Sequence, residues 1–260
     1  MRLQESREPH QLVLANPSSL AFREHVSMKI VILTGAGISA ESGVKTFRDH
    51  NGLWEGHRIE DVATPEAFDR DPALVHDFYN KRRHQLAEVH PNAAHVALVE
   101  LEAAFGNDFL LITQNVDDLH ERAGSERVLH MHGELLKKRC QWCSEVTPCE
   151  PAAVLDTADR CGQCGSTRGM RPDIVWFGEM PYHLDEIEIA LRDADVFIAI
   201  GTSAVVYPAA QFFAMAAMHG ATTIEINLAP TARSNEFDER LFGPATETVP
   251  KLVRDLIAKR

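Results

Sequence analysis

The sequence has few basic residues and no long apolar run. Lysine and arginine number 26 against 38 aspartates and glutamates, which gives the 260 residues a formal charge of −12. Because the nucleic acid backbone is also anionic, this charge argues against DNA or RNA as a specific partner and suits a basic protein substrate better. No segment approaches the roughly 20 apolar residues that a bilayer span needs, and no signal-peptide pattern stands at the start. We therefore expect a soluble, cytoplasmic protein without a membrane partner.

Repeats and low-complexity linkers are also missing. With 45% hydrophobic residues, the sequence can bury a full core, either as one large domain or as a large domain with a small insert. Residues 1–27 are polar and mixed in charge, and we interpret them as a surface helix or a loose leader. The globular domain is expected over residues 28–260.

Cysteine is scarce, but four of the five cysteines follow a metal-site pattern. Two residues separate Cys140 from Cys143, and two residues separate Cys161 from Cys164. In structural zinc sites each such pair turns tightly so that its thiolates converge on one ion, so the spacing predicts a closed four-cysteine zinc site. A redox pair is the alternative, but it would need only one such motif. Cys149 has no partner in this scheme.

Apolar runs alternate with helical patterns along the chain. The predicted strands, each followed by small or polar residues, are 29–34, 109–113, 195–200 and 222–226. The predicted helices are 72–89, 93–105, 184–192 and 209–218. Strands that alternate with helices predict an α/β fold with a parallel, doubly wound sheet. The segment of about 136–172, which holds the cysteine pairs, interrupts the alternation and is interpreted as an inserted small zinc-binding domain.

The first predicted strand is followed by a glycine-rich turn. Gly35, Gly37 and Ala40 match the G-x-G-x-x-A dinucleotide fingerprint, in which small residues let the backbone approach a pyrophosphate. The acidic residue that usually closes a second strand about 20 residues later is missing, because residues 46–56 have the pattern of a polar loop. The sequence therefore does not predict a standard dehydrogenase, and the glycines taken alone could serve only a tight turn.

Several longer motifs occur together in one order. They are GAGISAESGVKTFRDHNGLW at 35–54, TQNVDDLHERAG at 113–124, HMHGEL at 130–135, the two cysteine pairs, VWFGEMP at 175–181, GTS at 201–203 and INLAP at 226–230. In this order they resemble the sirtuins, the NAD-dependent protein-lysine deacylases, over about residues 28–250. The resemblance implies a Rossmann-like NAD domain with a small zinc domain, NAD as co-substrate, and acylated-lysine proteins or peptides as partners.

The resemblance also assigns residues to NAD. They are Gly35, Ala36, Gly37, Ile38, Ser39, Phe47, Arg48, Trp54, Gln114, Asn115, Val116, Asp117, Gly201, Thr202, Ser203, Asn227, Leu228, Ala229 and Ala245. Residues 35–39 would lie beneath the phosphates, residues 114–117 along the nicotinamide and its ribose, and residues 201–203 and 227–229 along the adenosine half. Each group follows a predicted strand, as expected for ligands of open α/β sheets. A single residue such as Asn115 could instead only cap a helix.

His132 matches the catalytic base of the family. In sirtuins the acyl oxygen attacks the nicotinamide ribose, nicotinamide leaves, and a base deprotonates a ribose hydroxyl of the resulting O-alkylimidate. The products are free lysine, nicotinamide and O-acyl-ADP-ribose. Imidazole suits this step because its unperturbed pKa lies near neutrality. His130 stands two residues earlier on an apparent strand, and we expect it to point to the opposite face as a hydrogen-bonded structural ring.

The motif at 173–179, DIVWFGE, is expected to be an edge strand that pairs with the substrate peptide by strand addition. Val175 and Phe177 match the family positions that hold the lysine stem. Trp176 could equally belong to the core.

One further feature bears on the acyl group. Tyr79 and Arg82 lie three residues apart on one face of a predicted helix, where a phenol and a guanidinium can jointly bind a carboxylate. Ala63 is small enough to leave room. The set resembles class III sirtuins, among them the bacterial CobB type, which favour succinyl-, malonyl- or glutaryl-lysine beside acetyl-lysine. The alternative is that Lys81, Arg82 and Arg83 form a solvated charged face.

The sequence departs from the commoner sirtuin pattern in two places. Lys45 and Thr46 stand where many sirtuins have proline, and Asp118 replaces a small or amide residue. We expect effects on the order of the loop and on the charge near the nicotinamide pocket. Two other functions stay open, a zinc-stabilised NAD-binding or interaction module without turnover and a mono-ADP-ribosylating enzyme.

Overall fold

The computed structural model describes residues 28–45, 54 and 56–260. The predicted leader and two of the predicted cofactor residues, Phe47 and Arg48, therefore lie outside the described residues. Within the described part of the chain, no helix combines the length and the apolar character that crossing a membrane requires.

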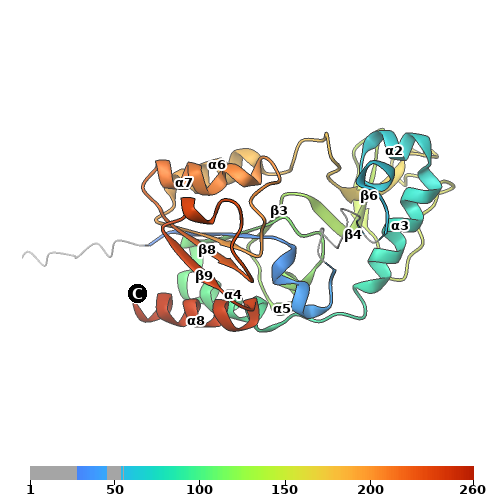
Figure 1. Ribbon diagram of the computed structural model, residues 1–260. Helices are drawn as coiled ribbons and strands as arrows, with labels where there is room; N and C mark the ends of the chain where they lie inside the picture. The colour runs from blue at the N-terminus through green and yellow to red at the C-terminus, as the bar shows by residue number, and fades with distance from the viewer. Residues whose placement is uncertain (1–27, 46–53, 55) are drawn as a thin grey trace, which may run out of the picture.

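Six parallel strands form the central sheet in the order β3-β2-β1-β7-β8-β9 (Figure 1). They are β1 (Ile30–Thr34), β2 (Phe109–Thr113), β3 (Val128–His130), β7 (Val196–Ile200), β8 (Thr222–Asn227) and β9 (Glu239–Phe242). The four predicted strands are confirmed to within one residue at each end. The predicted α/β fold with a Rossmann-like parallel sheet is therefore confirmed.

Helices cover both faces of this sheet (Figure 1). They are α4 (Ala93–Phe105) and α8 (Ala245–Ala258) on one face, and α6 (Leu184–Asp193) and α7 (Phe212–Met218) on the other. The central strand β1 is buried along its whole length because its side chains pack against both helix layers. Ile30 and Ile32 pack towards α4 and α8, whereas Val31 and Leu33 pack towards α6 and α7, as the alternation of a strand requires.

Short polar side chains set the starts of two helices near the site. Asp71 caps α3 (Pro72–Gln85) by accepting from the backbone N–H of Leu74 at 3.0 Å. Asn92 caps α4 by accepting from the N–H of Ala94 at 2.9 Å. The helix α3 ends four residues before the predicted residue 89, whereas α4 has the predicted bounds. The predicted helix 209–218 is a 3₁₀ turn, Ala209–Gln211, followed by α7.

A smaller unit lies beside the carboxyl ends of the central strands. Its antiparallel sheet has the order β5-β4-β6, formed by β4 (Gly133–Cys140), β5 (Val146–Pro148) and β6 (Met170–Ile174). Three helices pack against this sheet, α1 (Ile59–Val62), α2 (Pro65–Arg70) and α3. The unit thus joins two separate stretches of the chain, one before α4 and one after the short helix α5 (Leu119–Ala123).

The edge strand that we predicted over residues 173–179 is misplaced. β6 does lie at the edge of its sheet, but it ends at Ile174. Beyond it, the N–H of Val175 donates to the carbonyl of His132, and the N–H of Phe177 donates to the carbonyl of Ala63. The chain therefore leaves the strand and crosses between two other segments.

The interpretation of residues 81–83 as a solvated face is wrong for two of the three. Lys81 is exposed and pairs with Asp77 at 2.7 Å. Arg82 and Arg83 are only 9% and 0% exposed. A run of three charges on one helix is thus split by the 100° turn between successive residues.

Arg83 ties α3 to the smaller sheet and to the loop beyond it. Its Nε donates to the carbonyl of Leu135 at 2.9 Å, and its Nη1 donates to Asn80 Oδ1 at 2.8 Å and to the carbonyl of Ala153 at 3.1 Å. Because the bonds to Leu135 and Asn80 are buried, water cannot replace the guanidinium there if it is removed.

We predict that Arg83→Met lowers the free energy of unfolding by about 2–4 kcal/mol, since buried acceptors lose a charged donor. Lys81→Met removes a charge of the same sign from the same helix, and it should change the stability by less than about 0.5 kcal/mol because Lys81 is exposed. Urea unfolding of both variants checks this. Equal losses in the two variants would contradict the role given to Arg83.

Candidate active site

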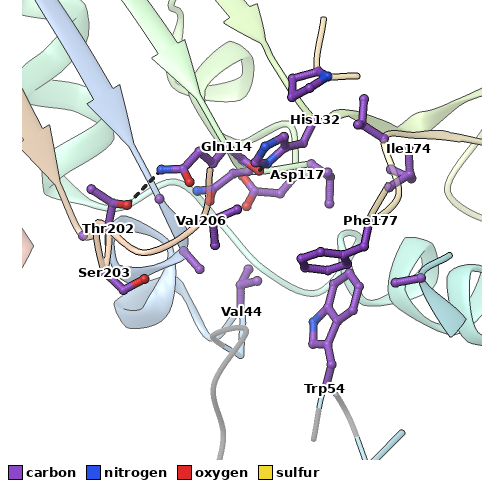
Figure 2. A pocket seen from close by; sticks show the side chains of 18 of the residues that line it. Val44, Trp54, Gln114, Asp117, His132, Ile174, Phe177, Thr202, Ser203 and Val206 are labelled. Carbon is purple, nitrogen blue, oxygen red and sulfur yellow. Dashed lines mark hydrogen bonds between the residues drawn. The ribbon is translucent and has the colours of Figure 1, made fainter. Parts of the chain in front are cut away.

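A cavity of about 480 Å³ lies where the smaller unit faces the carboxyl ends of β1, β2, β7 and β8. Its volume falls within the range of roughly 300–1,000 Å³ that is typical of ligand sites. Figure 2 shows Thr202 at one end of the cavity and Trp54 and Phe177 at the other, with Gln114 and His132 between them. Residues far apart in the sequence meet here because parallel strands present their carboxyl ends at one edge.

Most of the predicted site residues line this cavity. From the predicted cofactor set they are Gly35, Ala36, Trp54, Gln114, Asn115, Val116, Asp117, Gly201, Thr202, Ser203, Asn227, Leu228 and Ala229. From the predicted substrate set they are Ala63, Tyr79, Arg82, Val175 and Phe177. His132 lies in the wall as well.

Four predicted cofactor residues are not part of the wall. Gly37 packs against the backbone of Gly201, and Ile38 belongs to the core under α4 and α8. Ser39 is fully buried behind the wall. Ala245 begins α8 and packs into the same core as Ile38.

The contact between Gly37 and Gly201 explains the glycine pattern of the first turn. A Cβ on Gly37 would stand 2.6 Å from the Cα of Gly201, and a Cβ on Gly201 would stand 2.5 Å from the backbone N of Ile38. Gly201 also has a φ of +61°, in the left-handed region that favours glycine. The turns that follow β1 and β7 thus approach each other more closely than any residue with a side chain would allow.

Sequence reasoning did not assign several residues that line the cavity. They are Val44, Lys45, Ile174, Trp176, Gly178, Glu179, Pro181, Val206, Tyr207 and Thr231. Glu179 and Pro181 belong to the motif at 175–181, so the motif was a usable signal for them. Val206, Tyr207 and Thr231 lie on the loops after β7 and β8, and only the position of these loops at the strand ends could have indicated them.

His132 is held in one tautomer. Its Nδ1 lies 3.1 Å from the carbonyl oxygen of Gln114, and since a carbonyl only accepts, Nδ1 carries the hydrogen. The Nε2 atom of the neutral ring is then an acceptor. Burial lowers the pKa of His132 below its ordinary value, and the bond to Gln114 opposes this only in part. The ring is therefore neutral at pH 7.

Gly133 lets the chain turn sharply after this histidine. Its φ is +80°, and an added Cβ would stand 2.0 Å from the carbonyl oxygen of Asp173 in β6. Because no side chain fits there, β4 can start directly beside β6. His132 is thereby placed at the junction of the two sheets.

His130 is separated from His132, but not for the reason that we expected. Residues i and i+2 of one strand share a face, so alternation alone would have put both rings on the same side. β3 instead ends at His130, and the fully buried Met131 begins the turn between the sheets.

The expectation that His130 is a structural ring is confirmed. Its Nδ1 lies 3.2 Å from the carbonyl of Asn115, and its Nε2 lies 2.6 Å from a carboxylate oxygen of Glu121. Both partners only accept, so both ring nitrogens carry hydrogen. Burial alone would lower the pKa of His130, but the hydrogen bond and the charge of Glu121 outweigh it and raise the pKa.

A buried polar cluster supports the wall near His132. Ser39 Oγ donates to Asp117 Oδ2 at 3.1 Å and accepts from Asn115 Nδ2 at 3.2 Å. Burial raises the pKa of Asp117, and hydrogen bonds from Leu119 and Ser39 oppose the shift. Asp118, by contrast, is not part of the wall, and it lies 3.6 Å from Arg122 within the same helical turn. Its carboxylate is therefore paired away from the cavity.

Tyr79 and Arg82 meet at the far end of the cavity, as their spacing on α3 predicted. The Tyr79 hydroxyl oxygen accepts from the indole Nε1 of Trp176 at 3.0 Å. Arg82 lies over the Trp54 ring, with its Cζ 4.3 Å from the ring centroid. Trp176 is 2% exposed, packs beside Phe68, and touches the cavity, so it is both core and wall.

The segment after β6 is fixed by an ion-pair network. Glu179 accepts from both terminal nitrogens of Arg171, at 2.7 and 2.8 Å, and from the backbone N–H of Trp176 at 2.8 Å. The Cζ atom of Arg171 lies over the Trp176 ring, 3.3 Å from the ring centroid. Arg139 Nη2 adds a fourth donor to Glu179 at 3.1 Å. These contacts hold Val175 and Phe177 in place without a strand.

The four cysteines of the predicted zinc site come together. Their sulfur atoms all lie within 4.8 Å of one another, and Cys140 to Cys164 and Cys143 to Cys161 measure 3.7 and 3.6 Å. A tetrahedron with Zn–S bonds of about 2.3 Å has edges of about 3.8 Å, so the residues fit a zinc ion. A closed four-thiolate shell gives the metal a structural role.

The fold and the site define an α/β protein with a cavity at the strand ends and a separate four-cysteine zinc centre. Residues 35–208 match the model of the Sir2 family. Because this match covers more than half of the chain, the protein belongs to the Sir2 family, the sirtuins.

Two relatives are similar over most of the chain. The NAD-dependent protein deacylase of Escherichia coli (strain K12) is 56% identical over 238 residues, which cover 88% of this chain and 82% of the relative. The NAD-dependent protein deacylase of Vibrio vulnificus (strain YJ016) is 57% identical over 231 residues, which cover 88% of this chain and 94% of the relative.

Solved structures agree with the fold. A complex of a Sir2 homologue with NAD superposes with a TM-score of 0.81 at 45% identity, covering 89% of this chain and 90% of that one. A complex of Sir2 with a p53 peptide and NAD+ gives a TM-score of 0.71 at 29% identity, covering 89% and 92%.

We predict that the purified protein holds one zinc ion per chain and that Cys161→Ser loses it, with a lower unfolding midpoint, because a three-thiolate site is no longer closed. Cys149→Ser is the matched control, since Cys149 is buried but lies outside the cluster. Metal analysis and thermal unfolding measure both effects. Full zinc content in Cys161→Ser would contradict the proposed ligand set.

Proposed function

We propose that this sirtuin removes succinyl, malonyl, glutaryl and acetyl groups from lysine side chains of proteins, with NAD as co-substrate. The products are nicotinamide, O-acyl-ADP-ribose and free lysine. One observation carries the proposal, namely that a single cavity contains a neutral histidine base, the loops of four parallel strands, and a tyrosine–arginine pair. NAD-dependent deacylation is the activity named for both bacterial relatives.

The adenosine half of NAD is assigned to the loops after β7 and β8, and the nicotinamide half to the loops after β1 and β2. Backbone groups at the ends of parallel strands suit phosphates and ribose hydroxyls, which need donors and acceptors at fixed positions. Gln114 links the two halves of the cavity, because its Nε2 donates to Thr202 Oγ1 at 2.9 Å (Figure 2). The nicotinamide ribose is thereby assigned to the space beside His132.

His132 is assigned as the general base. The hydrogen bond of its Nδ1 to Gln114 leaves Nε2 to accept a proton from a ribose hydroxyl. The depressed pKa keeps the ring unprotonated at neutral pH. NAD itself supplies the leaving group, nicotinamide, whereas the protein supplies the proton acceptor and the enclosure.

Tyr79 and Arg82 are assigned to an acyl carboxylate. Since an indole N–H only donates, the hydrogen of the Tyr79 hydroxyl is not used in the bond to Trp176 and can be donated to a substrate. Burial raises the pKa of Tyr79, so the hydroxyl keeps this hydrogen. Arg82 places its guanidinium over the Trp54 ring in the cavity wall, and a planar guanidinium can contact a carboxylate through two parallel N–H bonds.

The lysine stem and the substrate backbone are assigned to the segment after β6. Val175 and Phe177 line the cavity between the acyl end and His132, and Phe177 is 43% exposed. Ala63, whose carbonyl fixes Phe177, adds no bulk to the wall. Such main-chain recognition tolerates many sequences around the modified lysine.

We predict that His132→Ala lowers kcat on a succinyl-lysine peptide by about 10²–10⁴-fold, the usual contribution of a general base, while the fold is retained. In the wild type, activity should fall on the acid side only below the ordinary histidine pKa of about 6.5, because the pKa of His132 is lowered and the active form is neutral.

Nicotinamide and O-succinyl-ADP-ribose should form in equal amounts. Transfer of ADP-ribose to protein would favour mono-ADP-ribosylation, and absence of both products would favour a non-catalytic module.

We predict that Arg82→Met lowers kcat/KM for a succinyl peptide by about 10–100-fold, the worth of charged hydrogen bonds, but changes kcat/KM for an acetyl peptide less than about threefold. Tyr79→Phe should shift the ratio in the same direction by a smaller factor, because it removes one neutral donor. Lys81→Met is the matched control, since this side chain is exposed on the same helix. An equal loss for the two acyl groups would defeat the carboxylate assignment.

A further inference from the structure

Glu225 in β8 is a buried carboxylate with no role in the steps above. It is 1% exposed, and among the described residues no lysine, arginine or histidine forms an ion pair with it. Its Oε2 is buried and has no hydrogen-bond partner among these residues. A buried carboxylate that is only partly satisfied destabilises a fold, so its presence calls for an explanation.

The other oxygen of Glu225 contacts two residues of the cavity wall. Oε1 accepts from Asn227 Nδ2 at 2.9 Å and from Thr231 Oγ1 at 2.9 Å. Asn227 Nδ2 also donates to the carbonyl of Thr202 at 3.0 Å. Both hydrogens of the Asn227 amide are thereby engaged within the protein. The group that Asn227 can offer to a ligand is its oxygen, which accepts from a hydroxyl.

This arrangement bears on the acidic residue that the dinucleotide fingerprint lacks in the sequence. In standard dinucleotide folds that residue closes the second strand, binds the ribose hydroxyls of NAD, and disfavours a 2′-phosphate. Here the negative charge comes from β8, next to β7, on the side of the cavity assigned to the adenosine half.

We propose that Glu225 is a positioning and specificity residue for the adenosine ribose. It fixes Asn227 as an acceptor for the unphosphorylated ribose diol, and its buried charge repels a phosphate ester on that diol. The protein therefore selects NAD against NADP through a carboxylate that does not itself touch the ligand. This inference rests on the placement of the adenosine half given under the proposed function.

A purely structural role for Glu225 predicts something different. If Glu225 only ties the loop of Thr231 to β8, its neutralisation should weaken ADP-ribose and its 2′-phosphate alike. If its charge selects the diol, neutralisation should change the ratio of the two affinities. Because the charge is buried, that ratio should also depend little on salt.

The test is equilibrium binding of ADP-ribose and of ADP-ribose 2′-phosphate to the zinc-loaded full chain by calorimetry. Wild type should bind ADP-ribose more tightly by about 100-fold, and Glu225→Gln should reduce this preference at least about tenfold, as expected for loss of one nearby like charge. Glu239→Gln is the matched control, because it removes the same charge from an exposed position in the neighbouring strand β9. It should leave the preference unchanged.

Three results would overturn the inference. They are equal affinities of the two ligands in the wild type, an unchanged preference in folded Glu225→Gln, and an equal loss of preference in Glu239→Gln. The first needs no variant, so the inference is testable even if Glu225→Gln does not fold. Wild type that does not bind ADP-ribose at all would instead contradict the proposed function.

Discussion

The site depends on the contact between two turns that carry no side chain at their meeting point. Gly37 follows β1 and Gly201 follows β7, and either one with a Cβ would collide with the backbone of the other turn. The N–H of Gly37 donates to the carbonyl of Gly201 at 2.9 Å, so the turns are joined as well as adjacent. Because neither turn projects a side chain at this point, the strand ends stay open to a ligand, and the residues that follow each turn reach the cavity. The fingerprint glycines thus serve the approach of two protein segments to each other, as well as any approach of protein to phosphate.

The smaller unit supplies a second wall of the cavity, which the parallel sheet cannot form alone. A sheet edge offers loops at one side of a ligand, but enclosing a lysine side chain needs a second wall. Gly133 brings the two sheets together directly after His132, and Arg83 fastens α3 to the smaller sheet. The network of Glu179 and Arg171 then holds the crossing segment between them. His132, Tyr79 and Phe177 therefore share one cavity although they come from three separate stretches of the chain.

Strands that form long apolar runs were predictable from the sequence, whereas features that depend on tertiary contacts were not. The strands β1, β2, β7 and β8 are apolar runs that are buried on both faces, and such runs can be recognised directly in a sequence. The short β3 and β9 pair with neighbours through only three and four residues, which is too few for a pattern. The end of β6 at Ile174 depends on the carbonyls of His132 and Ala63, which lie far away in the sequence. The zinc ligands were predictable because their spacing is itself the geometry of the site.

The buried charged residues Arg82 and Glu225 show that residue type alone does not predict whether a side chain is exposed. Arg82 stands in a run of basic residues that ordinarily forms a solvated face, yet it is buried against Trp54. Glu225 stands in the middle of an apolar strand, where a charge is least expected, yet the loop that carries Thr231 covers it. Each residue departs from its local pattern, because Arg82 is buried against Trp54 and Glu225 is bonded by Thr231 of the loop after β8. Since burying a charge destabilises the fold, binding rather than stability accounts for both residues in the proposed function. In the proposed function, a basic end and an acidic end also give the cavity a direction, with the acyl carboxylate beside Arg82 and the uncharged ribose diol beside Asn227.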